Sequence, residues 1–455
     1  MYSVTRRLSY LFVFACGLAF GRTEYRAGVA TVDITPTVPI RLSGYASRTK
    51  PSEGKVTDLH AKALVIERGK NQKVVIVTTD LIGLPRSITD VVAARVAKTA
   101  GLERAQILFN SSHTHTGPYV RGTLPLMFPM SDADKVVIDR YADRLADSLI
   151  DVIGRALADL GPVEISVAHG ETKFAMNRRQ GVTGAVKIGL NPKGPSDFDV
   201  PVLRVESVGP KGVRKIKAIV FGYACHNTTL PGDENRISGD YAGFAQEAIE
   251  KANPGATAMF VLLCGADQNP NPRGTIDLAR KHGDELAVEV GRVLGGKVDK
   301  VSGPIKTAFQ VVDLDFQPTD RATFEARLND KLAARVTHAK TMIERIDRGD
   351  PVRHYPYPVQ AISFGKSFTV VAMGGETLVD YDLRIKKEFP GQNLMVAGYS
   401  NDVMAYIPSL RVSKEGGYEV MDSMYYYAMP APWADSTEER IMATVHKVMA
   451  RVKSR

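Results

Sequence analysis

Short apolar runs that alternate with amphipathic stretches constrain the fold of this chain more than any other feature of its sequence. Residues 61–66 and 74–80 are two such runs, separated by a polar turn at residues 68–73. They predict a hairpin whose second arm, Val-Val-Ile-Val-Thr-Thr-Asp, is buried. A second hairpin is expected over residues 360–373, turning at Gly365. Single strands are expected at residues 106–109, 163–167, 200–205, 218–224 and 258–263.

Amphipathic helices are predicted between these strands. In residues 87–100 the apolar positions recur at helical spacing, Ser87 precedes them as a cap, and Gly101 ends the stretch. The C-terminal helix is expected to begin with the capping box Ser436-Thr-Glu-Glu439. The other expected helices cover residues 134–160, 241–252, 276–294 and 323–348. This alternation predicts an α/β fold in which helices cover a mixed β-sheet.

The bulk properties indicate one large globular domain. No repeat and no Ser-, Gly- or Pro-rich linker divides the chain, and 44% hydrophobic with 24% charged residues is ordinary for a globular protein. The net charge of +9 is dispersed in short runs, such as residues 211–217, and no nucleic-acid-binding motif accompanies it. We therefore expect no nucleic-acid partner, whereas peripheral contact with an anionic membrane surface stays open. The sequence carries no signal for the oligomeric state.

Residues 1–23 have the pattern of an export signal rather than of part of the domain. A pair of arginines precedes an apolar stretch over residues 8–20, which is too short to span a membrane comfortably. The catalytic domain is then expected over residues 24–455, in a protein exported to the periplasm or the extracellular space. Cys16 lies in a segment that loosely resembles a lipoprotein cleavage site. The large Phe14 fits such a site poorly, and lipid anchoring stays an open alternative.

Two cysteines, Cys225 and Cys264, follow this signal. In an oxidising compartment they could form a disulfide bond. The alternative is a pair of buried thiols at strand ends, because the sequence does not fix the distance between them. Both possibilities stay open.

Side chains able to bind a metal or move a proton directly follow four of the predicted strands. In an open α/β sheet the loops at the carboxyl ends of the strands meet in one crevice, so we expect these loops to form a single site. The residues concerned are His113 and His115 in Ser112-His-Thr-His-Thr-Gly-Pro118, His226 after Cys225, Asp267 and Asn269 after Cys264, and Glu376 after two glycines.

The histidines of these loops suit zinc. The His-x-His pattern of His113 and His115 offers two imidazoles, whose nitrogens bind Zn²⁺ at about 2.0–2.1 Å. Such a pair also occurs as ordinary polar residues of a loop. For His226 the alternative is a core histidine that bonds to a backbone carbonyl.

The carboxylates of these loops allow several roles. Glu376 ends a buried strand, where a carboxylate needs a partner such as a metal ion, although it could instead cap the following helix. Asp267 and Asp80 also end apolar strands, and either could orient a metal-binding histidine. For Asp80 the pattern favours the alternative of a loop cap.

Several segments in order resemble the neutral, non-lysosomal ceramidases over most of the sequence after the export signal. The His-Thr-His run is the most specific of them. The matching segments are Ala27-Gly-Val-Ala-Thr-Val-Asp-Ile-Thr-Pro36, Gly44-Tyr45, His60, Thr79-Asp80, Ser112-His-Thr-His-Thr-Gly-Pro118 and Asn177-Arg178.

This resemblance implies a site built around one zinc ion per chain. Tyr406 is assigned from Asn401-Asp-Val-Met-Ala-Tyr406, in which Val403 replaces a tyrosine of the family pattern, and its alternative is a core aromatic residue. The implied zinc ligands are His113, His226, Glu376 and Tyr406. The residues implied to steady the reacting carbonyl are His115, Arg178 and Tyr418.

Two departures from the family concern the substrate. The family's Gly-Asp-x-Ser-Pro-Asn run reads Ala266-Asp-Gln-Asn-Pro-Asn271 here, so Asn269 stands where the family has a serine. An amide cannot act as an alkoxide nucleophile. Members of the family usually carry a C-terminal immunoglobulin-like domain, which we do not expect in this chain, and lipid handling is therefore in question.

The expected function is hydrolysis of a linear amide, such as an N-acyl sphingoid base, by water that zinc activates. His115 or a nearby acid would pass a proton to the leaving group, while Arg178 and Tyr418 would stabilise the oxyanion. The expected partner is a small-molecule or lipid substrate. Two alternatives stay open: a related metallohydrolase that acts on an ester or a glycoside, and a non-catalytic secreted binding protein on the same fold.

Overall fold

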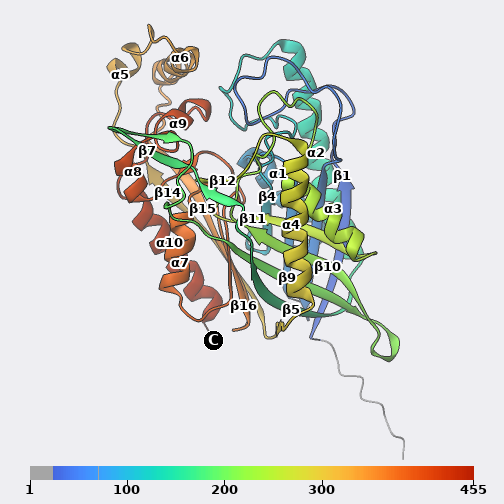
Figure 1. Cartoon of the computed structure of the whole chain (residues 1–455). Helices are drawn as coiled ribbons and strands as arrows, with labels where there is room; N and C mark the ends of the chain where they lie inside the picture. The colour runs from blue at the N-terminus through green and yellow to red at the C-terminus, as the bar shows by residue number, and fades with distance from the viewer. Residues whose placement is uncertain (1–23, 70, 455) are drawn as a thin grey trace, which may run out of the picture.

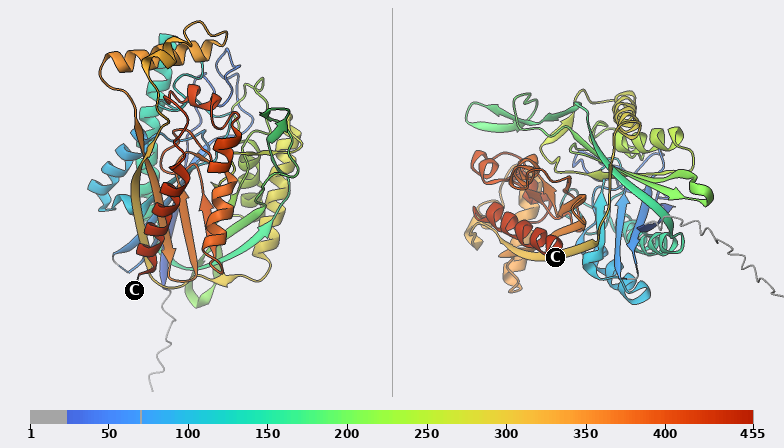
Figure 2. Two further views of the ribbon diagram at one scale, coloured as in Figure 1. Left: turned by 90° about the vertical axis from the view of Figure 1, so that its left-hand side faces the viewer. Right: turned by 90° about the horizontal axis from the view of Figure 1, so that it is seen from below.

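The computed structural model describes residues 24–69 and 71–454, so the predicted export signal with Cys16 lies outside the described residues. Two β-sheets pack face to face, and helices cover their outer faces (Figures 1 and 2). The predicted mixed sheet covered by helices is confirmed, and the structure adds a second sheet to it. Among the described residues, no helix is both long enough and apolar enough to cross a membrane.

The larger sheet has nine strands in the order β11-β10-β9-β5-β1-β2-β3-β4, with β13 paired to β5. The pairs β10/β11 and β3/β4 are parallel and the others are antiparallel. The strands are β1 (Tyr25–Asp33), β2 (His60–Arg68), β3 (Gln72–Thr79), β4 (Ile107–Ser111), β5 (Gly161–Glu171), β9 (Asp199–Val208), β10 (Arg214–Tyr223), β11 (Thr257–Leu262) and β13 (Asp299–Lys300).

The smaller sheet has four strands in the order β14-β15-β16-β18, of which only β16 and β18 are parallel. These strands are β14 (Ile305–Asp315), β15 (His354–Phe364), β16 (Phe368–Met373) and β18 (Leu394–Ala397). Three short pairs lie outside the two sheets: β6 (Ala175–Asn177) with β12 (Gln268–Pro270), β7 (Arg179–Val182) with β8 (Ala185–Ile188), and β17 (Glu376–Thr377) with β19 (Tyr406–Ile407).

Alternation along the strands explains why the two sheets pack together. In β2, Leu64 and Ile66 lie in the apolar cluster between the sheets, whereas Ala63 and Val65 lie in the cluster beneath the helices. The facing side of the smaller sheet contributes residues such as Ile362 to the same inter-sheet cluster. Because both faces are buried, the central strands form the continuous apolar runs from which the strands are predicted.

Helices complete the outer layers. The larger sheet is covered by α1 to α4, and the smaller sheet by α7 and α10 (Figure 2). The helices are α1 (Arg86–Ala100), α2 (Asp132–Ala158), α3 (Asp240–Ala252), α4 (Ile276–Leu294), α5 (Arg321–Glu325), α6 (Ala333–Asp347), α7 (Val379–Glu388), α8 (Leu410–Glu415), α9 (Asp422–Tyr426) and α10 (Thr437–Lys453).

Three local helix predictions are wrong. Helix α1 begins one residue before Ser87, after Pro85, so the serine is inside the helix and does not cap it. Ser436 has helical dihedral angles and makes no side-chain capping hydrogen bond to α10, so no capping box forms there. The stretch 323–348 is divided between α5 and α6, and Asp330 accepts a hydrogen bond from the backbone of Leu332 in the turn between them.

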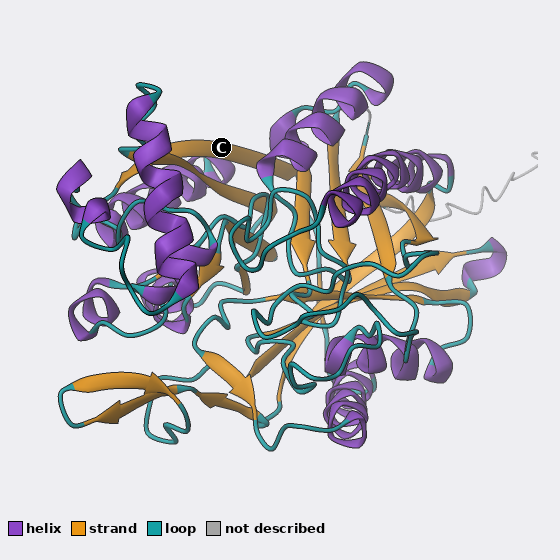
Figure 3. Cartoon of the chain, turned by 90° about the horizontal axis from the view of Figure 1, so that it is seen from above, coloured by secondary structure: helices purple, strands orange, loops and turns teal. Residues whose placement is uncertain are grey.

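Asn110 joins the two edge strands of the larger sheet to each other and to the smaller sheet. It lies on edge strand β4, and its side-chain amide exchanges two hydrogen bonds with the backbone of Leu262 on the other edge strand, β11, at 2.8 and 3.2 Å. Its nitrogen also donates to the carbonyl of Gly398, just after β18, at 2.8 Å. At this end of the molecule loops gather over the strand ends (Figure 3).

Candidate metal centre

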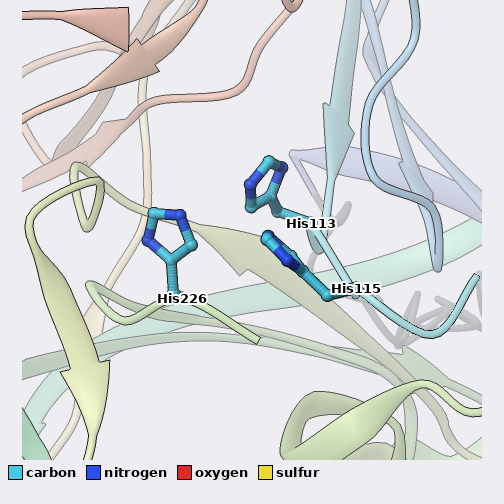
Figure 4. A group of neighbouring side chains, drawn as sticks. All are labelled: His113, His115 and His226. Carbon is cyan, nitrogen blue, oxygen red and sulfur yellow. The ribbon is translucent and has the colours of Figure 1, made fainter. Parts of the chain in front are cut away.

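Three histidine rings converge from loops of the larger sheet (Figure 4). His113 and His115 follow β4 and His226 follows β10, and one nitrogen of each ring lies within 4.8 Å of the others. His113 and His226 are buried, and His115 is partly exposed. The prediction that the loops after these strands meet is therefore confirmed.

The backbone and ring of His113 are held by one neighbouring loop. Its φ of 61° lies in the left-handed region, which costs a non-glycine residue about 1–3 kcal/mol and persists only where the surroundings enforce it. The backbone N–H donates to Leu81 at 2.8 Å, and Nδ1 lies 2.5 Å from the carbonyl of Ile82. Because a carbonyl only accepts, the neutral form of the ring has its proton on Nδ1 and a lone pair on Nε2.

His226 is oriented in the same way. Its Nδ1 donates to the carbonyl of Gly265 at 3.0 Å, which leaves a lone pair on Nε2. That nitrogen lies 3.2 Å from the hydroxyl of Tyr406. Burial, and after it the charge of Arg178, lowers the pKa of His226 to about 4, so the ring is neutral near pH 7.

His115 packs against the loop that carries Gly44 and Tyr45. Gly44 has a φ of +93°, and a Cβ there would lie 2.4 Å from the imidazole ring, so the close approach requires glycine. The ring of Tyr45 packs edge-on at 4.9 Å between centroids. Burial, with the neighbouring histidines, lowers the pKa of His115 well below its usual value, and neither ring nitrogen has a hydrogen-bond partner.

Glu376 and Tyr406 reach the same point from segments that follow β16 and β18 of the smaller sheet. The chain leaves β16 through Gly375, whose φ is +69°, and β17 then pairs in parallel with β19 so that Glu376 lies opposite Tyr406. Glu376 Oε2 lies 3.0 Å from Nε2 of His113 and 3.2 Å from Nε2 of His226. The backbone pairing therefore brings a carboxylate and a phenol to the histidines.

The donor set fits a zinc ion. His113 Nε2 and Glu376 Oε2 are buried and have no hydrogen-bond partner, although they face each other. Two acceptors at this distance repel and are costly to bury unless a proton or a cation lies between them. Neutral imidazole nitrogens with a carboxylate oxygen are the ligands that zinc takes in catalytic sites.

Arg178 lies beside these residues in a buried hydrogen-bond network. Its guanidinium donates to the hydroxyl of Tyr406 at 3.0 Å, to Oδ1 of Asn269 at 3.2 Å and to Glu419 at 3.0 Å. The ring of Tyr418 packs edge-on against Tyr406, with 5.5 Å between centroids. The structure therefore brings the predicted Arg178, Tyr418 and Asn269 to the histidine cluster.

The amide of Asn269 has a fixed orientation. Its oxygen accepts hydrogen bonds from Arg178 and from the hydroxyl of Thr228, at 3.2 and 3.3 Å. Because a guanidinium only donates, the Asn269 oxygen must face it, and the amide nitrogen is turned the other way. Where the resemblance implies a serine, the amide nitrogen of Asn269 is therefore the hydrogen-bond donor.

Neither Asp267 nor Asp80 orients a histidine, although either could have done so; for Asp80 the sequence already favoured a loop cap. Asp267 accepts hydrogen bonds from a backbone N–H and from the side chain of Asn177, and burial raises its pKa to about 6. Asp80 accepts from a backbone N–H and from the side chain of Gln246. These carboxylates bind to neighbouring strands and helices, and backbone carbonyls orient the rings of His113 and His226 instead.

Two residues of the site have no counterpart in the sequence-based prediction. The hydroxyl of Tyr427 donates to Oε1 of Glu376, and Glu419 pairs with both Arg178 and Arg179. Glu419 is adjacent to the predicted Tyr418, which is the one available signal for it. Tyr427 ends a run of three tyrosines in which nothing distinguishes the inward-facing member.

Cys225 and Cys264 are both buried and unpaired in the part of the chain that the structure describes. Burial raises the pKa of both thiols. The alternative of two buried thiols is therefore confirmed.

Sequence comparisons link the chain to ceramidases. Residues 25–276, just over half of the chain, match the family described as neutral/alkaline non-lysosomal ceramidase, N-terminal. A neutral ceramidase of Drosophila melanogaster is 24% identical over 333 residues, which are 67% of this chain and 44% of that protein. A neutral ceramidase of Mycobacterium tuberculosis is 23% identical over 254 residues, which are 51% and 38% of the two proteins. The chain spans less than half the length of these relatives.

Solved structures show the same fold. The crystal structure of neutral ceramidase from Pseudomonas aeruginosa aligns with a TM-score of 0.72 at 17% identity, over 95% of this chain and 76% of that one. A ceramidase complexed with C2 aligns with a TM-score of 0.71 at 16% identity, over the same shares of the two chains. At such identities the likeness shows the fold alone.

Proposed function

Because the chain belongs to the neutral/alkaline non-lysosomal ceramidase family, we propose that it is an exported, zinc-dependent hydrolase that cleaves a linear amide of the N-acyl sphingoid base type. The observation that carries this proposal is the convergence of unpaired acceptors from two sheets. His113 Nε2 and Glu376 Oε2 face each other in the buried centre, with His226 and Tyr406 beside them. These four side chains would hold the ion.

When bound, zinc lowers the pKa of water toward neutrality and polarises a carbonyl oxygen. The chain's own residues then orient the substrate and handle protons. The guanidinium of Arg178, held by Glu419, is placed to bind an amide carbonyl and to stabilise negative charge on its oxygen. His115 is neutral with both ring nitrogens unbonded, so it is able to accept a proton and pass it to the leaving nitrogen.

A cavity whose lining includes sequence neighbours of two site residues supports an apolar chain in the substrate. Its volume of about 550 Å³ lies within the range of about 300–1,000 Å³ that is usual for ligand pockets. Its lining includes Ala46 and Tyr426, each one residue away from a side chain of the site, Tyr45 and Tyr427. The apolar side chains of this lining include Leu126, Met127, Phe128, Met130 and Leu332.

The direct test combines metal analysis with a substrate panel. The purified protein is stripped with a chelator, reloaded with zinc, and assayed on a short-chain fluorescent ceramide beside chromogenic esters and glycosides. We expect about one zinc per chain, cleavage of the ceramide by the loaded protein, and loss of cleavage in the stripped protein.

The outcomes separate the parts of the proposal. A protein that binds zinc but cleaves only an ester or a glycoside would overturn the amide substrate. One that binds zinc and cleaves none of the panel would favour a binding protein on this fold. A protein that cleaves the ceramide equally well after stripping would overturn the zinc dependence. Variants that remove a buried histidine, such as His113→Ala, need a matched control. His354→Ala serves as that control, because it removes an exposed histidine of the smaller sheet.

A further inference from the structure

Three consecutive tyrosines at the end of α9 have different surroundings. Tyr425 packs edge-on against the ring of His338, with 5.1 Å between centroids. Tyr426 is partly exposed and lines the apolar cavity. Tyr427 is buried, and its hydroxyl donates a hydrogen bond to Oε1 of Glu376. Only the third tyrosine therefore reaches the metal centre.

The two carboxylate oxygens of Glu376 are in different environments. Oε1 accepts the hydrogen bond from Tyr427. Oε2 has no hydrogen-bond partner and lies 3.0 and 3.2 Å from the ring nitrogens of His113 and His226. One oxygen is thus already occupied by a protein donor, and the other alone faces the donor set.

The hydroxyl of Tyr427 is the donor in this pair, because a carboxylate oxygen without a proton only accepts. The ring of Tyr427 is buried with the carboxylate, which keeps water away from the contact.

We propose that Tyr427 is a positioning residue, which holds Oε1 of Glu376 so that the carboxylate binds the metal ion through Oε2 alone. This inference rests on the proposed zinc site and adds to it the residue that sets the binding mode of its carboxylate. Residues that orient metal ligands typically change metal affinity by about ten- to a hundredfold when they are removed.

The test measures zinc affinity rather than turnover. Tyr427→Phe removes the hydroxyl and keeps the ring, and Tyr425→Phe is the matched control because it removes the hydroxyl of a nearby tyrosine that packs against His338 and does not contact Glu376. Zinc dissociation constants are measured by competition with a chromophoric chelator, and the melting temperatures of the metal-free proteins are compared. We expect a ten- to a hundredfold weaker affinity in Tyr427→Phe, an unchanged affinity in Tyr425→Phe, and similar melting temperatures without metal.

Co²⁺ in place of zinc gives a second readout that a merely structural role would not move. The visible Co²⁺ spectrum should change in Tyr427→Phe, because the released carboxylate alters the coordination, and should stay as in the wild type in Tyr425→Phe. Equal zinc affinities and equal Co²⁺ spectra in wild type and Tyr427→Phe would overturn this inference alone. A wild-type protein that binds no zinc would overturn the proposed function together with it.

Discussion

The two sheets bring different chemistry to the candidate metal centre. The larger sheet brings imidazole nitrogens, on the loops that carry His113 and His226. The segments that follow β16 and β18 of the smaller sheet bring oxygens, on the separate short strand pair of Glu376 and Tyr406. Neither sheet alone holds the whole donor set, so the centre exists only where the two sheets are packed together. Metal binding and the packing of the sheets are therefore expected to be coupled.

Removing one metal ligand from each side tests most strongly whether both sheets contribute to the centre. His113→Ala and Glu376→Ala should each abolish stoichiometric zinc binding and lower kcat/KM by more than about a hundredfold, because even residues that only orient ligands cost about ten- to a hundredfold. Elemental analysis and turnover of a short-chain ceramide measure the two effects. If Glu376→Ala kept its zinc while His113→Ala lost it, the smaller sheet would not contribute a ligand.

Asn110 tests the physical junction of the sheets. Asn110→Ala leaves backbone groups of Leu262 and Gly398 buried without their partner, and we expect the free energy of unfolding to fall by about 2–3 kcal/mol. Urea denaturation measures the change. Asn253→Ala removes an amide that bonds only within the end of α3, and it should cost less than about 1 kcal/mol. Equal losses in the free energy of unfolding would show that the hydrogen bonds of Asn110 contribute no more than those at the end of a helix.

Asn269→Ser tests whether metal-activated water or a side chain at position 269 attacks the substrate. Metal-activated water needs no protein nucleophile, so we expect kcat/KM for ceramide to change by less than about tenfold. Asn269→Ala separates the loss of the amide, which accepts from Arg178, from the gain of a hydroxyl. A hundredfold gain in the serine variant over both other proteins would indicate that serine attack is the faster route.

The smallest expected effect concerns a second contact between the sheets. His169 of β5 pairs with Asp199 at 2.8 Å and contacts Asn393, just before β18, at 2.6 Å. Burial disfavours its charge, but the hydrogen bond and charge of Asp199 outweigh burial and raise the pKa of His169. A group whose pKa is raised on folding stabilises the fold at pH values below its unfolded-state pKa, here about 6.5. This contribution is lost as the pH rises through the folded-state pKa.

Urea denaturation at two pH values measures this contribution. The stability difference between wild type and His169→Asn should be larger at pH 5.5 than at pH 8.5, by less than about 1 kcal/mol, because the pair is partly exposed. A difference that is larger at pH 8.5 would contradict the assigned direction of the pKa shift.

The larger sheet was largely predictable from the sequence, because its signals are local. The hairpin of β2 and β3 and the bounds of α4 follow from apolar periodicity and turn residues. The convergence of His113 and His226 follows from a general property of strand ends, since both residues come directly after buried strands.

The smaller sheet's part of the site was less predictable, because it depends on contacts between distant segments. Glu376 and Tyr406 meet through a pair of two-residue strands that leave no periodic pattern, and only the family resemblance indicates Tyr406. The direction in which the Tyr427 side chain points depends on how α9 packs. A run of three identical residues in the sequence does not indicate which of them points inward. Asp267 follows an apolar strand like the histidines, yet its partners are Asn177 in β6 and the backbone of Val379 at the start of α7.

X-ray absorption spectroscopy of the zinc-loaded protein tests most directly whether both sheets hold the ion. We predict a first shell of nitrogen and oxygen at about 2.0–2.2 Å with the signature of two imidazoles, and the loss of one oxygen in Glu376→Ala. A sulfur neighbour at about 2.3 Å, or a shell that is the same in wild type and Glu376→Ala, would contradict a centre shared between the two sheets.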